Sequence, residues 1–294
     1  MSHSWNAYFK VTFSVVAWGA SFIATKVALQ EIHPATVVWL RFGIGILILG
    51  LAARWRGQMA LPQKKDIPYF ALLGFIGITF HQWLQSTGLV TAQASTTAWI
   101  VATTPIFMAL LGWLVLREKL TKFQVFGIVL ATIGVLLVVS KGNLSALGLK
   151  GSVTPGDILI MISAPNWAIF STLSRRGLKE HSAVLMMLYV MGFGWLFTTA
   201  LFFSGPGLFE ISQLTLPGWL SILFLGIACS GLAYIFWYDG LQAIPASQVG
   251  AFLYLEPLVA VVIAAIVLME PIFLASLLGG ATILLGVWLV NRAK

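Results

Sequence analysis

The strongest constraint on this chain is a long apolar segment that occurs twice. Residues 246–271 exceed the roughly 20 apolar residues that cross a bilayer, yet they carry Glu256 and Pro257 near their middle. Residues 94–119 match them without a gap, at the offset that separates Pro105 from Pro257 (257 − 105 = 152). The matched pairs are Ser95/Ser247, Pro105/Pro257, Glu118/Glu270, Gly74/Gly226, Gly88/Gly240, Gly127/Gly279 and Gly134/Gly286. Because glycine and proline determine local backbone shape, a register of this length indicates a duplicated backbone.

The composition selects the class of protein. Hydrophobic residues make up 59% of the chain and charged residues 9%, which is too little charge to cover a water-soluble surface. We therefore expect an all-α polytopic membrane protein. The net charge of +8 is first a topology signal, so no nucleic-acid partner is expected. The single cysteine, Cys229, lies in an apolar run and cannot form an intrachain disulfide.

Ten apolar segments predict ten transmembrane helices. They fall at about 9–29, 34–53, 67–90, 93–116, 122–140, 156–174, 183–203, 217–238, 245–269 and 272–291. The segments divide into a first five-helix repeat at 1–140, an outer connecting loop at 141–155 and a second five-helix repeat at 156–294. Because five is an odd number, the second repeat must enter the membrane from the opposite side, so the two repeats are predicted to be inverted.

The distribution of cations predicts the orientation. With both termini cytoplasmic, thirteen Lys and Arg residues lie inside and only four lie outside. The inner ones are Lys10, Arg54, Arg56, Lys64, Lys65, Arg117, Lys119, Lys122, Arg175, Arg176, Lys179, Arg292 and Lys294; the outer ones are Lys26, Arg41, Lys141 and Lys150. No small-residue cleavage site follows the first apolar run, so we interpret it as a helix and not as a removed signal peptide.

Inverted repeats are typical of secondary transporters, whose sites lie near the midplane between the two halves. The first helix of each half carries a tryptophan beside a residue that weakens a helix. Gly19 follows Trp18, and Pro165 lies two residues before Trp167. Interruptions at matching places point to a transporter site, and we expect Pro165 to break its helix.

Four motifs together resemble the EamA-like branch of the drug/metabolite transporter superfamily. They are Ala17-Trp18-Gly19-Ala20-Ser21-Phe22 with Lys26, Leu40-Arg41-Phe42, Pro105 with Leu116-Arg117-Glu118-Lys119-Leu120, and Leu255-Glu256-Pro257 with Met269-Glu270-Pro271. The resemblance covers nearly the whole chain. It implies a five-plus-five inverted bundle in a bacterial-type inner membrane that exports amino acids, related metabolites or amphipathic drugs. Met269 and Pro271 depart from the family pattern of a small residue and a cation beside the acid, which weakens a charge-pair role for Glu270.

Three polar residues at membrane depth are candidates for handling a solute. Glu256 lies near the midplane, where an ionised carboxylate costs about 2.5–3.5 kcal/mol unless it is paired, hydrated or protonated. It either couples protons or braces the kink at Pro257. Arg41 either binds a substrate carboxylate or pairs with Glu31 or with backbone carbonyls. His81 either lines a cavity, where it could exchange a proton, or is a hydrogen-bonded core residue.

We expect aromatic and polar side chains inside the helices to line a central cavity. Indole walls with a few amide, hydroxyl and imidazole groups suit a flat, apolar or amphipathic solute. The alternative is that the rings only fill space between helices. The candidate substrate-binding residues are Trp18, Ser21, Arg41, His81, Gln85, Trp99, Thr103, Asn166, Trp167, Gln248, Phe252 and Glu256, of which Glu256 and His81 are also candidates for proton coupling.

The favoured function is a secondary exporter that works by alternating access at a midplane cavity. A facilitative permease and a non-transporting membrane scaffold are the alternatives. An enzyme is not expected, because the sequence shows no nucleophile–base pair, no metal motif and no GxxxxGK[ST] phosphate loop. The four histidines are scattered along the chain, so neither a metal site nor a cofactor is expected. Besides the solute and the lipid bilayer, a homodimer is possible, although a monomer is expected to suffice for transport.

Overall fold

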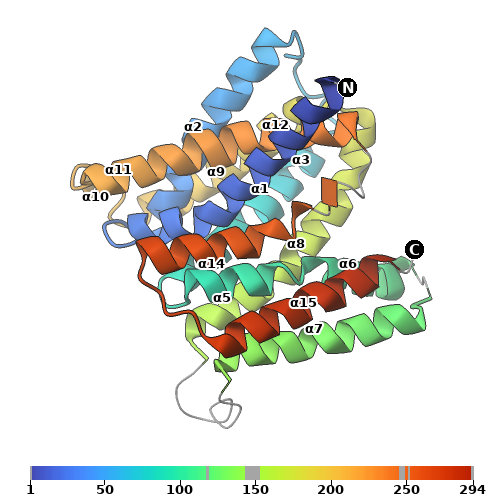
Figure 1. Ribbon diagram of the computed structural model, residues 1–294. Helices are drawn as coiled ribbons and strands as arrows, with labels where there is room; N and C mark the ends of the chain where they lie inside the picture. The colour runs from blue at the N-terminus through green and yellow to red at the C-terminus, as the bar shows by residue number, and fades with distance from the viewer. Residues whose placement is uncertain (1, 117–118, 143–152, 245–248, 251, 293–294) are drawn as a thin grey trace.

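The computed structural model describes residues 2–116, 119–142, 153–244, 249–250 and 252–292 (Figure 1). These residues form helices and connecting turns without any β-strand, which confirms the predicted all-α class. The helices are α1 (Ser2–Ala28), α2 (Pro34–Trp55), α3 (Ile67–Gly74), η1 (Phe75–Phe80), α4 (His81–Leu89), α5 (Ala94–Val101), α6 (Thr104–Leu116), α7 (Lys122–Ser140), α8 (Pro155–Glu180), α9 (Ala183–Phe203), α10 (Leu208–Ile211), α11 (Leu216–Leu223), η3 (Phe224–Leu232), α12 (Ala233–Ala243), α14 (Leu255–Val267) and α15 (Leu274–Arg292). The segments η1 and η3 are π-helical.

Eight helices in the described ranges are long and apolar enough to cross a membrane. They are Trp5–Ala28, Pro34–Trp55, Ile67–Leu89, Ala94–Val115, Lys122–Ser140, Pro155–Glu180, Ala183–Phe203 and Leu216–Ala243. Two shorter apolar helices, Leu255–Val267 and Leu274–Val290, follow them. The chain is therefore a polytopic helical membrane protein, and the eight spans agree with the first eight predicted segments within a few residues at most boundaries.

Two of the crossing segments contain π-helical turns, and two apolar helices begin beside a proline. η1 joins α3 to α4, and η3 joins α11 to α12, without a gap. α5 ends at Val101, and α6 begins at Thr104, directly before Pro105. α14 begins at Leu255, two residues before Pro257. A proline fits the first turn of a helix because its missing N–H would have no partner there.

The expectation that Pro165 breaks its helix is wrong. α8 continues without interruption from Pro155 to Glu180, with Pro165 in its interior. The proline removes a single backbone donor, and the next residue anchors the helix to its neighbour, since Asn166 Nδ2 donates to the Ile76 carbonyl in η1 (2.9 Å). α1 likewise continues through Gly19.

Gly19 instead allows two helices to approach closely. A Cβ added to Gly19 would lie 2.7 Å from the Glu256 carbonyl oxygen, closer than real Cβ contacts occur. The absence of a side chain therefore brings α1 against the first turn of α14.

Glycines also hold α7 and α15 together, which lie side by side in Figure 1. A Cβ on Gly127 would lie 2.6 Å from the Gly286 carbonyl oxygen, and one on Gly134 would lie 2.6 Å from that of Gly279. In the sequence, however, Gly127 matches Gly279 and Gly134 matches Gly286. Gly127 thus contacts the sequence match of Gly134, and Gly134 contacts the sequence match of Gly127. A two-fold relation between two repeats produces this reciprocal pattern.

The two termini lie at the same end of the helices, on the right of Figure 1, and α10 lies at the opposite end. We call these the terminal end and the α10 end. Between them, α1 packs on η3, α12 and α14, whereas α8 packs on α4, α5 and α6. α2 packs on α9 across the centre of the bundle. Trp18, Arg41, His81 and Trp167 lie on four of these helices, α1, α2, α4 and α8.

Candidate functional site

Arg41 on α2 is a buried cation whose partners are neutral. It is 6% exposed, and it donates from Nε to Ser230 Oγ (3.1 Å) and from Nη1 to Gln82 Oε1 (3.3 Å). The predicted alternative partner, Glu31, is bound elsewhere, because it lies beyond the end of α1 and accepts from Thr215 N (2.7 Å) and Thr215 Oγ1 (2.6 Å). Neither hydrogen-bond partner of Arg41 in the described part of the chain therefore balances its charge.

Trp18 lies beside the segment that binds Arg41. Its Nε1 donates to the carbonyl of Cys229 (3.2 Å), the residue before Ser230. The Trp18 ring also contacts Tyr234 and Trp237, with ring centroids 5.5 and 5.2 Å apart. The aromatic rings of Trp18, Tyr234 and Trp237 therefore lie beside the segment of η3 that binds Arg41. The half-buried Ser21, also a predicted site residue, uses its hydroxyl to donate to the Trp18 carbonyl (2.6 Å).

A second aromatic group is formed by α4 and α8. The His81 ring lies against Trp167, with centroids 4.7 Å apart, and Trp167 contacts Phe170 at 4.8 Å. His81 is buried, and its Nδ1 has no hydrogen-bond partner among the described residues. The next residue, Gln82, accepts from Arg41. Gln82 therefore links the His81–Trp167 pair to Arg41.

Gln82 is a site residue that sequence reasoning missed. The helical spacing from His81 pointed to Gln85, which is half-buried, whereas Gln82 is buried and bonds Arg41. Both glutamines lie in α4 with His81, and the one directly after His81, not the one four residues later, reaches Arg41. The available signal was a second amide beside His81 in the same helix.

Trp99 and Thr103 lie apart from this group. Trp99 is buried against α15, where a Cβ on Gly280 would lie 2.4 Å from its ring. Its apolar neighbours include Ile106 of α6, Ile283 of α15 and other residues of α7 and α15. Thr103 lies between α5 and α6 and donates its hydroxyl to the Ile100 carbonyl (2.6 Å). The Trp99 side chain therefore fills the crossing with α15.

Two of the remaining predicted residues lie in or just before the first turn of α14, and a third lies on α8. Glu256 is half-buried in the first turn of that helix, with its carbonyl against Gly19. Phe252 is half-buried and stacks on Tyr8, with centroids 6.1 Å apart. Asn166 supports η1 through its bond to Ile76, described above. Gln248 lies outside the described residues.

At the α10 end, Glu270 binds the N-terminus of α5. It accepts from Ala94 N (2.8 Å), Ser95 N (3.2 Å) and Ser95 Oγ (2.7 Å), and Lys26 Nζ lies 3.8 Å away. The first N–H groups of a helix have no partner within the helix, and its dipole favours an anion there. Glu270 thus pairs with a cation, although its neighbour Pro271 is not one. Lys26 on α1 supplies the positive charge.

Glu210, on the short helix α10, binds the start of α2. It accepts from His33 N (3.1 and 3.2 Å) and from Thr36 Oγ1 (2.6 Å), and it contacts His33 Nδ1. Burial acts to raise the pKa of Glu210, but the hydrogen bonds from Thr36 and His33 outweigh it and lower that pKa below its ordinary value. Glu210 thus binds the segment that follows Glu31, and Glu31 binds Thr215 in the segment that follows Glu210.

At the terminal end, Asp239 lies between two cations. It accepts from Lys10 Nζ (2.7 Å) and from Arg56 Nη1 and Nη2 (2.7 and 2.9 Å). The hydrogen bond to Asp239 raises the pKa of the Arg56 guanidinium above its ordinary value. Sequence reasoning assigned both cations to topology and left Asp239 without a role.

A family comparison identifies the chain over nearly its whole length. The model of the EamA-like transporter family matches twice, at residues 5–140 and 154–292. An uncharacterized transporter of Bacillus subtilis, YyaM, is 29% identical over 96% of this chain and 92% of its own length. A probable terminal-alkyne amino-acid exporter of Streptantibioticus cattleyicolor is 26% identical over 98% of this chain and 94% of its own length.

A crystal structure of similar fold also covers the chain. It has a TM-score of 0.68 and 19% sequence identity, over 96% of this chain and 95% of that one. The similarity of fold and the two family matches agree with the resemblance found in the motifs around Trp18, Arg41 and Glu256. The chain belongs to the EamA-like transporter family, within the drug/metabolite transporter superfamily.

Proposed function

We propose that this protein is a secondary-active exporter of small amino-acid-like, aromatic or amphipathic solutes. The observation that carries the proposal is the environment of Arg41: a buried guanidinium with two neutral partners, beside the rings of Trp18, Trp167 and His81. A buried cation without a balancing anion is costly, and a guanidinium binds a carboxylate through two parallel hydrogen bonds. A solute with a carboxylate and an apolar or aromatic side chain satisfies both parts of the site.

The proposed architecture is ten transmembrane helices in two inverted five-helix repeats, at 1–140 and 156–294. The double match of the family model supports it. So do the π-helical turns at corresponding places, since η1 and the second part of η3 lie at the same offset as Pro105 and Pro257. The reciprocal glycine contacts of α7 and α15 provide a third argument.

Alternating access is supported by the contacts at the two ends, because those described here join the two halves. At the α10 end, Glu270 bonds Ser95 and Glu31 bonds Thr215, while at the terminal end Asp239 bonds Lys10. Opening either end requires its own set of contacts to break while the other set holds. The site around Arg41 lies between the two sets.

The direction and coupling of transport form the next part of the proposal. Export is supported by the relative that is named as a probable amino-acid exporter. Proton coupling through Glu256 or His81 is proposed because secondary transport against a gradient needs an ion, and both are titratable groups inside the spanning helices. A facilitative permease is the alternative. Uptake into liposomes with and without a pH difference separates the two.

We further propose that the protein lies in a bacterial-type cytoplasmic membrane with both termini in the cytoplasm. The excess of Lys and Arg in the loops assigned to the terminal end supports this orientation. The α10 end then faces outward. The site is formed within one chain, so a monomer suffices for transport.

The experiment is ligand-dependent thermal stabilisation of the purified protein, wild type against Arg41→Met. Free amino acids with apolar or aromatic side chains are expected to raise the melting temperature of the wild type, whereas their methyl esters, which lack the carboxylate, are not. Arg41→Met should weaken the apparent affinity for free amino acids by at least about tenfold, which corresponds to about 1.4 kcal/mol.

Arg41→Met should fold, because replacing an unbalanced buried charge by an apolar side chain is often neutral or stabilising. The matched control is Arg54→Met, which removes an exposed cation from the same helix and should leave the response unchanged. Equal stabilisation of wild type and Arg41→Met by free amino acids would contradict the proposed role of Arg41.

A further inference from the structure

Asp66 occupies a helix-capping position without acting as a cap. It is the N-cap residue of α3, yet its side chain makes no capping hydrogen bond. One reason is local: Pro68, the second residue of the helix, has no N–H to offer. The residue is 8% exposed, and its Oδ2 is buried without a hydrogen-bond partner in the described ranges. A buried carboxylate oxygen without a donor is costly and calls for a ligand.

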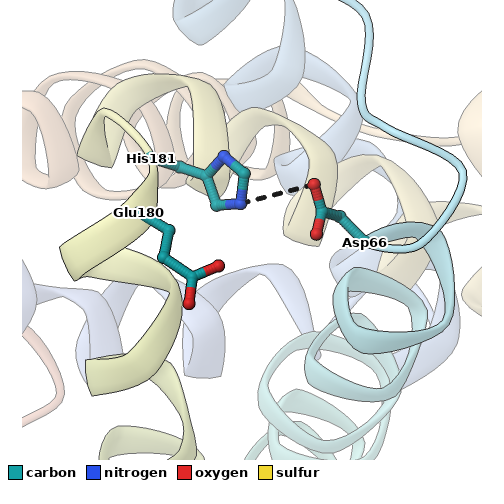
Figure 2. A group of neighbouring side chains, drawn as sticks. All are labelled: Asp66, Glu180 and His181. Atoms are coloured by element: carbon teal, nitrogen blue, oxygen red, sulfur yellow. Dashed lines mark ion pairs between the residues drawn. The ribbon is translucent and has the colours of Figure 1, made fainter.

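Asp66 Oδ2 points toward His181 and forms an ion pair with it (Figure 2). His181 ends α8, and its Nε2 lies 3.6 Å from Asp66 Oδ2. The imidazole is held edge-on to the Phe70 ring, with centroids 5.1 Å apart. Tyr69 fixes the two segments, since its hydroxyl donates to the Leu173 carbonyl (2.7 Å) and accepts from Gly177 N (2.9 Å). The separation of Asp66 and His181 is therefore set by the packing around them.

Glu180 supplies a third donor from the last turn of α8. One ligand atom from each of Asp66, Glu180 and His181 lies within 4.8 Å of the others. The Glu180 side chain is 51% exposed, so it can rotate toward the other two. Arg176 Nε lies 3.8 Å from its carboxylate and is the cation that competes for it. Such an exposed pair contributes little free energy, so a bound ion can replace it.

We propose that Asp66, Glu180 and His181 form a binding site for a divalent transition-metal ion of the Zn²⁺ type. One imidazole and two carboxylates are ligands that Zn²⁺ takes, whereas Mg²⁺ and Ca²⁺ prefer oxygen ligands alone. Two ligand atoms on a tetrahedral zinc ion lie roughly 3.3 Å apart, from bonds of about 2.0–2.1 Å. The 3.6 Å between His181 and Asp66 needs only a small adjustment to reach this value.

The site joins segments that are distant in the chain. Asp66 begins α3, in the segment covered by the first family match, and His181 lies between α8 and α9, in the second. A bound ion ties these segments together near the terminal end and stabilises the fold through its preference for the folded state. This inference does not depend on the proposed transport function.

The experiment is titration of the tag-free, full-length protein in detergent with ZnCl₂, followed by calorimetry and by thermal melting. We expect saturable binding of one ion per chain and a rise in melting temperature that EDTA reverses. Asp66→Asn, His181→Gln and Glu180→Gln should each weaken binding by at least about tenfold. Glu180→Gln is the decisive variant, because an exposed side chain can be changed without loss of folding.

The matched control is His33→Gln. His33 also contacts a carboxylate, but that carboxylate belongs to Glu210 and is saturated by a backbone N–H and by Thr36. Its removal should leave zinc binding unchanged. The proposal is overturned if the wild type shows no saturable binding, if Glu180→Gln binds as well as the wild type, or if His33→Gln weakens binding as strongly as the other variants.

Discussion

The two ends of the helix bundle use carboxylates in different ways. At the α10 end, Glu270 and Glu210 accept hydrogen bonds from backbone N–H groups at the starts of α5 and α2. At the terminal end, the partners of Asp239 among the described residues are the long cationic side chains of Lys10 and Arg56. A backbone donor is held in place by its helix, whereas a Lys or Arg side chain can rotate away and exchange its partner for water or salt.

The contacts at the two ends therefore differ in what stabilises them. At the α10 end, the Glu270 and Glu210 side chains are 9% and 8% exposed and accept hydrogen bonds of fixed geometry, on which salt has little effect. The terminal end is held by partly exposed charge, which salt screens over a Debye length of about 8 Å at physiological ionic strength. If the bundle opens alternately at its two ends, as proposed above, ionic strength should act mainly on the terminal end.

The largest effect is expected at Glu270. Glu270→Ala leaves two N–H groups of α5 and the Ser95 hydroxyl without their acceptor, and it leaves Lys26 without its carboxylate. We expect the free energy of unfolding to fall by about 2–3 kcal/mol, with little dependence on salt. Denaturation in mixed micelles at two salt concentrations measures this. Ile272→Ala, an exposed neighbour, is the control, and an equal loss in both variants would break the comparison.

A smaller, pH-dependent effect is expected at Glu210. Because its pKa is lowered in the folded protein, its contribution to stability is present above the unfolded pKa of about 4.3 and is lost as the pH falls through the folded value. Glu210→Gln should therefore be less stable than the wild type by about 1 kcal/mol at pH 7, and the gap should close in strongly acidic solution. Melting temperatures of both proteins between pH 3 and 7 provide the test. A gap that widens on acidification would contradict the assignment.

The smallest effect is expected at Asp239. Asp239→Asn removes a carboxylate from Lys10 and Arg56, whose side chains are 25% and 35% exposed. The loss should be below about 1 kcal/mol at low salt and should disappear at high salt, because screening weakens the same attraction in the wild type. Melting temperatures over a range of NaCl concentrations show whether the two curves converge. Parallel curves would mean that the terminal end is held by packing and not by charge.

Several features of the site could be predicted because they depend on residues close in sequence. Pro105 and Pro257 were matched by their offset, and both lie in the first turn of a helix, where proline is tolerated. Trp18 and Arg41 were selected as a tryptophan and a charge inside apolar helices, and both adjoin the same segment of η3.

Other features could not be predicted, for reasons that the structure makes plain. Gln82 and not Gln85 meets Arg41, because the packing of α2 on α4 decides which amide reaches the guanidinium, and no local sequence pattern specifies that packing. Pro165 does not end its helix, because the neighbouring η1 anchors the next residue. Trp99 was grouped with the central rings, yet it packs against Gly280.

The membrane class, the repeated pattern and the family could all be read from the amino-acid sequence, because apolar length, the spacing of glycine and proline and short motifs do not depend on how the chain folds. The partners of the charged side chains depend on the three-dimensional packing of the helices. This packing brought His181 to Asp66, Glu270 to Ser95 and Asp239 to Lys10, each across more than a hundred residues of chain. The physical reason is that an apolar run specifies a helix locally, whereas the side chain that satisfies a buried charge is chosen by how the helices cross.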